Sequence, residues 1–470
     1  MKSLFGILLV LISAQAIAAE TGKSISTDDR TGLAVTVYHN DLALVKDTRR
    51  VSLQQSGRHT LLFVDVPKRI QAQSVFAKNL KQGAHWQVIE QNYRYDLITS
   101  KALLSEYVGR ELVLITYNND NQVQERIRAR LLAINDQPIY QIGNNIYLDH
   151  PGSVVLPEAP ENLVASPSLE WLVDADKGTH DIQVNYLTGG LAWQADYTLQ
   201  VDTDYETGNL STWASVTNNS GMSYPDANLK LVAGTLNRVH QKRAGLARQM
   251  ETAAAMGAAS IQREQFLDYH LFDVPGTVTL KQAQSKQIEL YPPASVKVDR
   301  QYSLEIPDAY TRRSNMGEQQ PVRIHVKIAN TEANNLGRPL PAGVVRVYSA
   351  DREAEIQFAG ESRTGAVAED ESMQISLGTA FDIIGKVNVM DVVTTGSGRS
   401  QVRDVTTQAT VTNRKQKKTV TVEVIPTFQE GWEILSASQK WSKLDSRRIK
   451  FELDIPSGKT VTINYKVRTK

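Results

Sequence analysis

The sequence predicts a mainly β protein built of several β-sandwich domains of immunoglobulin-like type, with a small β-barrel-like meander and a short helical insertion. Three observations lead to this prediction. Apolar and polar residues alternate with a period of two through most of the chain, as in residues 460–467, which indicates strands with one buried face. Gly, Asn and Asp residues mark turns at intervals of roughly 8–12 residues. Helices do not alternate with the strands, which argues against a parallel α/β sheet.

The first residues have the three-part layout of a secretory signal peptide. Lys2 supplies a positive charge, residues 4–12 form an apolar run, and Ala16-Ile17-Ala18 fits the small-residue pattern before a cleavage site. The apolar run is shorter than the roughly 20 residues that cross a bilayer, and no later stretch is longer and equally apolar. We therefore expect residues 1–19 to be removed and the mature chain to be periplasmic or secreted, with no transmembrane segment.

Residues 31–98 are expected to form a β-rich N-terminal region. Within it, residues 33–38 and 42–45 alternate around a turn at His39-Asn40-Asp41, which predicts a hairpin. The region ends before a short segment whose pattern changes from that of strands to that of a helix.

Residues 99–150 are expected to contain this short helix and a small β-meander. The segment from Ser100 to Val108 has a serine cap, an apolar face and a glycine stop at Gly109. Tight turns rich in Asn, Asp and Gly follow, which predicts a small curled sheet or barrel. Its four strands are expected at residues 111–117, 122–134, 137–142 and 145–148.

The rest of the chain divides where the composition changes. Residues 151–167 carry four prolines and predict a linker, and residues 168–240 predict a β-sandwich. Residues 241–268 interrupt the strand pattern, because they are rich in Ala, Met, Gln and Arg; they predict a poorly packed helix or a partly disordered insertion. A β-rich central region at 269–379 and a C-terminal β-sandwich at 380–470 complete the chain.

Charge and cysteine content limit the possible functions. The 52 Lys and Arg residues nearly balance the 51 Asp and Glu residues, so nothing draws the chain as a whole to nucleic acid or to anionic lipid. The chain has no cysteine, which excludes disulfides, thiol nucleophiles and Cys-ligated zinc. The expected partner is an envelope protein or a glycan, and not a nucleic acid.

The sequence contains none of the common local signatures of a catalytic or metal site. Its histidines are widely spaced, so no zinc-binding histidine pair of the local kind occurs, and no G-x-S-x-G elbow is present. The segments 174–178 and 202–206 begin like calcium loops but lack the ligand required at position twelve. We interpret them as hairpin turns, with an irregular calcium site as the alternative. No catalytic, metal-binding or cofactor-binding residue is assigned, and no cofactor is expected.

Tryptophans are the most informative large side chains. Leu191, Trp193 and Ala195 share one face of a predicted strand, and we expect Trp193 and Trp213 to lie in a sandwich core. The alternative is that they form a platform on which sugar rings stack. Trp441 lies in the polar run 439–445, so it is expected to be exposed and is the candidate contact residue.

Five segments carry a resemblance to a known family. They are VTVYHNDLALV at 35–45, QNYRYDL at 91–97, LAWQADY at 191–197, LKLVAG at 229–234 and GRPLPAGVVRVY at 337–348. In this order they resemble the exported bacterial family known as domain of unknown function 4139, which is related to the mucoidy inhibitor A proteins. The resemblance extends over nearly all of the mature chain. It implies an envelope location and a β-rich structure, and it assigns chemistry to no residue.

These observations favour a non-enzymatic envelope protein, with a binding or scaffold role, that holds a protein or a glycan on the surfaces of its sandwiches. Whether the chain is an enzyme is uncertain, and the absence of catalytic signatures makes a binding role the preferred hypothesis. One alternative is a hydrolase or lyase that acts on envelope polysaccharide, with carboxylates or a Tyr/Arg pair assembled between domains. Another alternative is a surface-assembly component that uses exposed sheet edges for strand addition.

Overall fold

The computed structural model describes residues 22–95, 98–118, 122–135, 137–150, 152–158, 160, 163–164, 166–234, 263–266, 269–308, 318–351, 353–396 and 401–469. Strands dominate this part of the chain, as predicted, and they form several sheets. The described residues contain one α-helix, α1 (Ser100–Glu106). Within the same residues no helix has the length and apolar character that a membrane span needs.

The chain divides into two compact units. Unit 1 comprises residues 1–192, 217–230 and 275–284, and unit 2 comprises residues 193–216, 231–274 and 285–470. Each unit is described below by itself.

Unit 1 holds two large sheets, and the hairpin predicted around residues 39–41 is present in one of them. The strands of the first sheet lie in the order β1 (Lys23–Ile25), β4 (Gly57–Phe63), β12 (Ser168–Ala175), β6 (Trp86–Arg94). In the second sheet the neighbours are β16 (Tyr224–Ala233), β2 (Arg30–Tyr38), β3 (Leu42–Leu53), β13 (Gly178–Thr188) and β5 (Phe76–Asn79), and β19 (Val278–Leu280) also pairs with β16. The predicted hairpin is formed by β2 and β3, whose ends pair Tyr38 with Leu42.

A buried ion network joins the strands of unit 1. Asp47 on β3 accepts hydrogen bonds from Arg30 at 2.9 Å and from Arg49 at 2.8 Å. The Arg49 side chain is fully buried and donates also to the carbonyl oxygens of Ile25 and Val64, while its guanidinium lies 3.7 Å from the centre of the Phe63 ring. A buried charge is tolerated only when it is paired and hydrogen-bonded, and here the partners come from β1, β2, β3 and the end of β4.

Turns from distant parts of the sequence converge on one another in unit 1. The carboxylate of Asp41 accepts from the backbone N–H of Gly190 at 2.7 Å and from Arg69 at 2.6 Å. Gly190 has a φ of 86°, and a Cβ at this position would lie 2.5 Å from Cα of Ser220. Only glycine fits such a close approach. The turn at Asp41, which lies in the segment 35–45, is therefore held in place by the packing of the fold.

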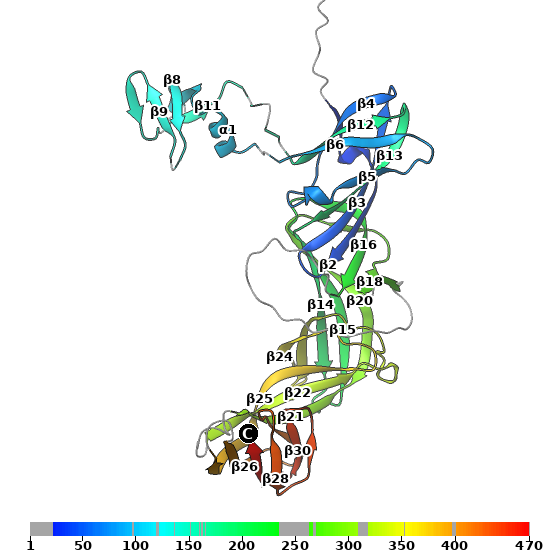
Figure 1. Cartoon of the computed structure of the whole chain (residues 1–470), viewed down its shortest axis with the longest axis vertical. Helices are drawn as coiled ribbons and strands as arrows, with labels where there is room; N and C mark the ends of the chain where they lie inside the picture. Colours follow the sequence, from blue (N-terminus) through cyan, green and yellow to red (C-terminus); the bar gives the residue numbers. More distant parts are fainter. Residues whose placement is uncertain are drawn as a thin grey trace, which may run out of the picture. The chain divides into compact units, whose positions relative to one another are not determined.

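The small sheet of unit 1 agrees closely with the predicted meander. Its order is β10 (Asn145–Tyr147), β9 (Ile139–Ile142), β8 (Val123–Ala133), β7 (Glu111–Tyr117), β11 (Ser153–Val155), and Figure 1 shows it in cyan beside α1. The cap of α1 is Thr99, whose hydroxyl accepts from the N–H of Ala102, and not the predicted Ser100. Residues 153–155, which lie in the segment predicted as a linker, pair with β7 as a strand.

Unit 2 contains a five-stranded sheet whose order is β20 (Gln284–Lys297), β15 (Thr207–Asn218), β14 (Leu191–Val201), β23 (Gly343–Ala350), β24 (Ile356–Thr364). The strands β14 and β15 are labelled side by side in Figure 1. Within this sheet β23 pairs antiparallel with β24, but β14 and β23 are parallel, with Ala195 opposite Gly343. The sheet therefore places a late segment of the chain next to the family-like segment 191–197.

Unit 2 also contains a nine-stranded sheet. Its order is β28 (Glu433–Ala437), β31 (Thr460–Thr469), β26 (Val402–Asn413), β25 (Ser372–Thr395), β22 (Glu318–Ala329), β21 (Asp299–Ile306), β27 (Val420–Pro426), β30 (Ile449–Ile455), β29 (Trp441–Lys443). Strands from the expected central region, 269–379, and from the expected C-terminal sandwich, 380–470, thus share this sheet. Their inward side chains form one apolar core around Leu304, Phe428 and Phe451.

Most of the insertion predicted at 241–268 lies outside the described residues. The exception is 263–266, which forms the strand β17 (Arg263–Phe266) and pairs with β18 (Tyr269–Asp273). For these four residues the prediction of helix or disorder is wrong. Pairing with a neighbouring strand outweighs the helix propensity of the segment around them, because β pairing depends on tertiary context.

Candidate functional site

The five-stranded sheet of unit 2 has one buried face and one open face, and the open face is the candidate site. On β14 the odd-numbered residues point inward: Trp193 is 2% exposed and donates from Nε1 to the carbonyl oxygen of Val232 at 3.0 Å. Tyr197 is fully buried and donates to the carbonyl oxygen of Pro341, and burial raises the pKa of its hydroxyl well above the ordinary value. Since side chains alternate along a strand, the even-numbered residues of β14 lie on the open face.

A row of charged side chains crosses the open face from β14 to β24. Arg346 on β23 donates to the carboxylate of Asp196 on β14 at 3.1 Å, and its Nε lies 3.2 Å from the carboxylate of Glu361 on β24. The amide of Gln194 lies 3.4 Å from both oxygens of Asp196. The two carboxylates therefore share one guanidinium, which fixes their positions on the sheet.

Aromatic side chains lie on the same face. Trp213 on β15 is 36% exposed, and the residues before and after it, Thr212 and Ala214, are buried. On the other side of the charged row, Tyr348 on β23 and Phe358 on β24 pack edge to face with ring centres 5.7 Å apart. Two aromatic patches thus flank the row of charges.

The exposure of Trp213 corrects the expectation that it lies in a sandwich core, whereas that expectation is confirmed for Trp193. The physical reason is the alternation of β15: its buried positions are Leu210, Thr212, Ala214 and Val216, so the position between Thr212 and Ala214 must face outward. Thr and Ala are weak signals of burial. The sequence therefore suggests that the large indole of Trp213 faces the core, although the smaller residues on either side of it do so.

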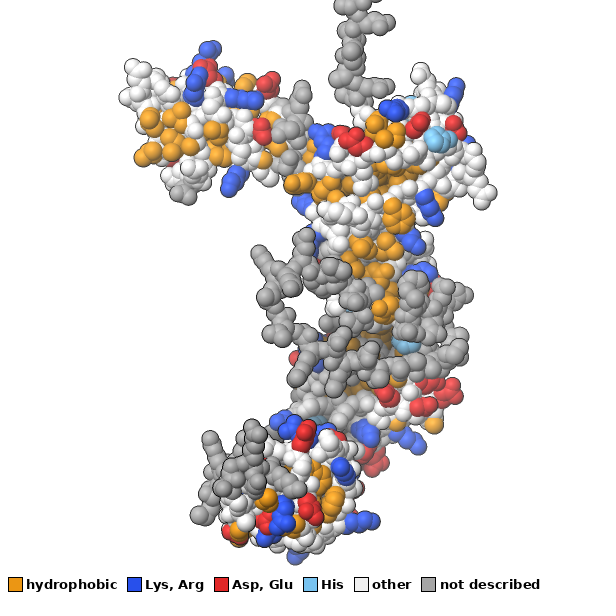
Figure 2. Space-filling model, in the orientation of Figure 1, with side chains coloured by type: hydrophobic (Ala, Val, Ile, Leu, Met, Phe, Trp, Pro, Cys, Tyr) orange, Lys and Arg blue, Asp and Glu red, His pale blue; other side chains and the backbone are white. Residues whose placement is uncertain are grey.

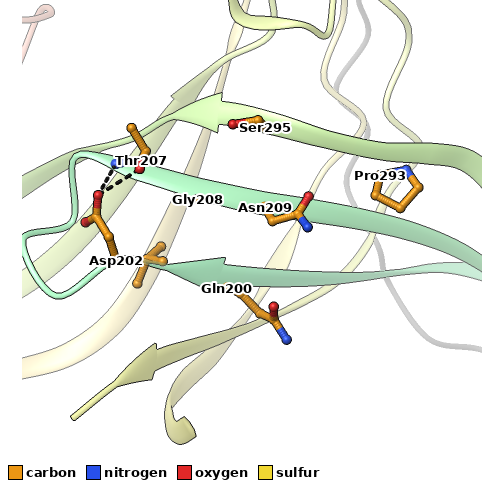
Figure 3. A pocket seen from close by; sticks show the side chains of 8 residues that line it. Gln200, Asp202, Thr207, Gly208, Asn209, Pro293 and Ser295 are labelled. Carbon is orange, nitrogen blue, oxygen red and sulfur yellow. Dashed lines mark hydrogen bonds between the residues drawn. The ribbon is translucent and has the colours of Figure 1, made fainter. Parts of the chain in front are cut away.

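A shallow hollow continues the open face toward the turn between β14 and β15. It has a volume of about 610 Å³, which is within the range of roughly 300–1,000 Å³ that small ligands occupy. Figure 3 shows the amides of Gln200 and Asn209 and the hydroxyl of Ser295 along it, with Pro293 at one end. Most of the residues that line it are polar, so they supply hydrogen-bond donors and acceptors.

The turn beside this hollow is one of the two segments that begin like calcium loops. Asp202 accepts from the N–H groups of Glu206 and Thr207 at 2.9 Å each and from the Thr207 hydroxyl at 2.8 Å, as Figure 3 shows in part. Burial opposes ionisation, but these hydrogen bonds hold the pKa of Asp202 below its ordinary value. The carboxylate is thus occupied in closing the hairpin, as interpreted from the sequence.

The other acidic segment, 174–178, contains the turn between β12 and β13, but these two strands belong to different sheets, so the interpretation of this segment as a hairpin turn is wrong. The carboxylate of Asp176 accepts from the N–H of His85 at 2.8 Å, and Asp174 lies 3.8 Å from the same histidine ring. Among the residues that the structure describes, no group of three or more potential ligands is close enough to hold a metal ion.

Trp441, the contact residue predicted from the sequence, is 37% exposed, as expected. It lies on β29 of the nine-stranded sheet, away from the residues of the open face. Its ring packs edge to face on Trp432 with centres 6.2 Å apart, and Trp432 in turn packs on the buried Phe428. The covered part of Trp441 therefore supports this aromatic cluster, and its role as a contact stays a prediction.

The open face can bind a ligand through stacking and hydrogen bonds. The signals that could reveal it in the sequence are the period-two row Gln194, Asp196, Thr198, Gln200 and the matching polar row on β15. Arg346 and Glu361 could not be found in this way, because they reach the site through the parallel pairing of β14 with β23. Comparisons of the chain with family models and with curated proteins find no match.

Proposed function

We propose that this chain is an exported, non-enzymatic envelope protein that binds a glycan strand on the open face of the five-stranded sheet. The observation that carries the proposal is Trp213, a large aromatic side chain that is 36% exposed in a row of polar residues. The exposed part of the indole is available to a ligand.

The chemistry of the face matches that of a sugar. A sugar ring has an apolar face, which can cover an indole or phenyl ring, and an edge of hydroxyl groups, which donate and accept hydrogen bonds. Trp213 and the pair Tyr348–Phe358 supply the aromatic surface. The amides of Gln200 and Asn209, in the hollow, supply both donors and acceptors.

The same face favours a glycan over a protein partner. The centre of a protein interface is depleted of charge and is apolar, but here the centre is the ion-paired row Asp196, Arg346, Glu361. A row of fixed charges on a flat sheet is well suited to hydroxyl groups, which hydrogen-bond to carboxylate and guanidinium without requiring their removal from water.

The arrangement of the two carboxylates favours binding over hydrolysis. Glycoside hydrolysis requires one carboxyl group that donates a proton and a second one that acts as base or nucleophile. In this sheet Asp196 and Glu361 both contact the Arg346 guanidinium, so both carboxylates are engaged in ion pairs. A hydrolase acting on envelope polysaccharide would need a carboxyl group that is free to donate a proton to the substrate.

The proposal is tested by replacing Trp213 with alanine and measuring glycan binding. The probes are soluble oligomers of glucose and of N-acetylglucosamine, followed by fluorescence titration, and amylose and β-glucan in affinity gels. We expect the Trp213→Ala variant to bind the probe that the wild type retains at least about tenfold more weakly, since one stacked aromatic is worth roughly 0.5–1.5 kcal/mol beyond its buried area.

Trp441→Ala is the matched control, because Trp441 is a second tryptophan of nearly equal exposure on a different sheet. Binding that is lost in Trp213→Ala and kept in Trp441→Ala supports the open face. Equal loss in both variants, or loss in Trp441→Ala alone, would contradict it. Wild-type protein that binds none of the probes would also contradict the proposal as stated for neutral glycans.

A further inference from the structure

A row of three arginines lies on the outward side of β8 in the small sheet. Arg126, Arg128 and Arg130 alternate with Ile127, Ala129 and Leu131, of which Ala129 and Leu131 are buried in the core of this sheet. All three arginines are exposed, and we refer to them as the arginine row. Residues two apart on a strand are separated by roughly 6.6–6.8 Å, so three guanidinium groups follow one another along about 13 Å of one face.

The arginine row has no ion-pair partner among the described residues. The nearest carboxylate across the strand is that of Glu111, which is opposite Arg130 in the register of β7 and β8, but the two do not form a salt bridge there. Three like charges on neighbouring positions of one face repel each other. Folding alone gives no reason to gather them, because the buried face of β8 is complete without them.

Apart from Glu111, the residues that lie opposite the arginine row on β7 and β9 are uncharged. In the pairing of β8 with β9, Arg130 lies opposite Gln141, and Gln141 lies opposite Ile146 on β10. On the other side, Arg128 lies opposite Val113. In Figure 2 the small sheet, at upper left, shows Lys or Arg side chains together with hydrophobic ones. The face therefore combines a line of positive charges with apolar side chains, against which the aliphatic parts of the arginine side chains can pack.

We propose that the arginine row is a binding site for an acidic polysaccharide, a chain whose sugars carry carboxylate or sulfate groups. A guanidinium presents a planar pair of donors that matches the two oxygens of a carboxylate or sulfate. A straight line of three such groups suits a linear polymer with regularly spaced anions, whereas the surface of a membrane has no preferred direction. The chain as a whole is nearly neutral, so the attraction is local to this sheet.

This inference goes beyond the proposed function and does not depend on it. The arginine row belongs to unit 1 and Trp213 belongs to unit 2. The ligand differs as well, because the open face suits neutral sugars and the arginine row suits anions. A failure of one proposal therefore leaves the other standing, and the probes for the two experiments are different.

The test is binding of the full-length mature chain to polygalacturonate and to heparin, measured at two salt concentrations. The variant carries three substitutions together, Arg126→Gln, Arg128→Gln and Arg130→Gln. We expect it to bind both polymers at least about tenfold more weakly at low salt, since three exposed ion pairs at roughly 0.5 kcal/mol each add up to this factor. The wild type should lose affinity with added salt, and the variant should show a shallower salt dependence, because fewer counterions are released.

The matched control removes three positive charges elsewhere: Lys297→Gln, Lys327→Gln, Lys386→Gln, which are exposed positions on β20, β22 and β25. It changes the net charge equally, so it should retain binding. The variant Arg126→Lys, Arg128→Lys, Arg130→Lys keeps the charge but loses the paired donors, so its affinity should lie between those of the wild type and the glutamine variant. Circular dichroism and the melting temperature verify that each variant is folded.

Three outcomes would overturn the proposal. Equal loss of binding in the arginine variant and in the lysine control would show that only net charge matters. Unchanged binding in the arginine variant would place the anion site elsewhere. Binding of the wild type to vesicles that contain phosphatidylglycerol, with no binding to either polysaccharide, would identify an anionic lipid surface as the ligand.

Discussion

The environment of one histidine illustrates how burial of single residues in unit 2 links stability to pH. His325 on β22 lies with Nε2 3.0 Å from the hydroxyl of Ser303, and its Nδ1 is buried without a partner in the described structure. Burial lowers the pKa of the ring below 6.5, with Glu305 acting in the opposite direction and Arg323 in the same direction. The neutral ring is thus the form that the folded chain accepts.

The first prediction at this scale concerns the pH dependence of stability. Because the folded pKa is lower than the unfolded one, the unfolded chain takes up a proton first as the pH falls below about 6.5, and stability decreases. We expect wild-type protein to lose more stability between pH 7.5 and pH 5 than His325→Gln does, measured as the midpoint of urea unfolding. If the unfolding midpoints of the two proteins changed with pH in the same way, His325 would not contribute to the pH dependence of stability.

At the scale of elements, the pairing of β14 with β23 decides whether the open face forms. The two strands approach closely at Gly343, where an added Cβ would lie 2.0 Å from the carbonyl oxygen of Ala195. This contact sets the register that brings Arg346 to Asp196. No larger residue fits between the two strands at this position. The sequence does not show this requirement, because Gly343 lies in the turn-like segment 337–348.

Replacing this glycine should therefore destabilise unit 2. We expect Gly343→Ala to lower the free energy of unfolding by about 1–3 kcal/mol, as overpacking in a well-packed region does, and to weaken glycan binding because the charged row shifts. Gly365→Ala is the control, since an added Cβ at Gly365 meets nothing within 4 Å. Chemical denaturation of both variants checks this; an equally stable Gly343→Ala would mean that the strands can move apart without cost.

At the scale of the whole molecule, the small sheet and the nine-stranded sheet have cores of their own. Leu114 is fully buried in the core of the small sheet with Tyr107 and Tyr140. Leu304 is fully buried in the core of the nine-stranded sheet with Phe428. Separate cores without shared residues are the physical basis for separate cooperative units.

Calorimetry should reveal these units. Each of Leu114→Ala and Leu304→Ala is expected to cost about 2–5 kcal/mol, and each should lower the temperature of a different transition in the thermogram. The two single variants serve as controls for each other. If both shifted one common transition by the same amount, the two cores would unfold together.

Much of the fold follows from the sequence because it depends on local periodicity. The small sheet is the best case: β7 begins and ends at the predicted residues, 111–117, and β8, β9 and β10 differ from the predicted strands only at their ends, whereas β11 lies in the segment predicted as a linker. Alternation of apolar and polar residues, with turns rich in Asn, Asp and Gly, is a property of neighbouring residues and needs no tertiary information. The buried Trp193 and the exposed Trp441 follow from the same reasoning.

The site could be predicted less well, because it depends on contacts between distant segments. The arginine row is visible in the sequence as R-x-R-x-R on a predicted strand, although its lack of ion pairs is not. The sequence alone favoured the buried face for Trp213. That prediction is wrong because the small residues Thr212 and Ala214 occupy the buried face of β15. Asp196, Arg346 and Glu361 meet only because β14, β23 and β24 are adjacent in one sheet.

By itself the sequence determined the β class, the small sheet, the hairpin around residues 39–41 and the absence of thiol chemistry, because each of these rests on composition or on residues close together in the chain. The tertiary structure alone decided which strands are neighbours, and hence that a parallel pair unites residues 150 positions apart into the open face. Strand pairing over such distances is a choice among many registers of similar local preference, and burial of one face against a core makes that choice.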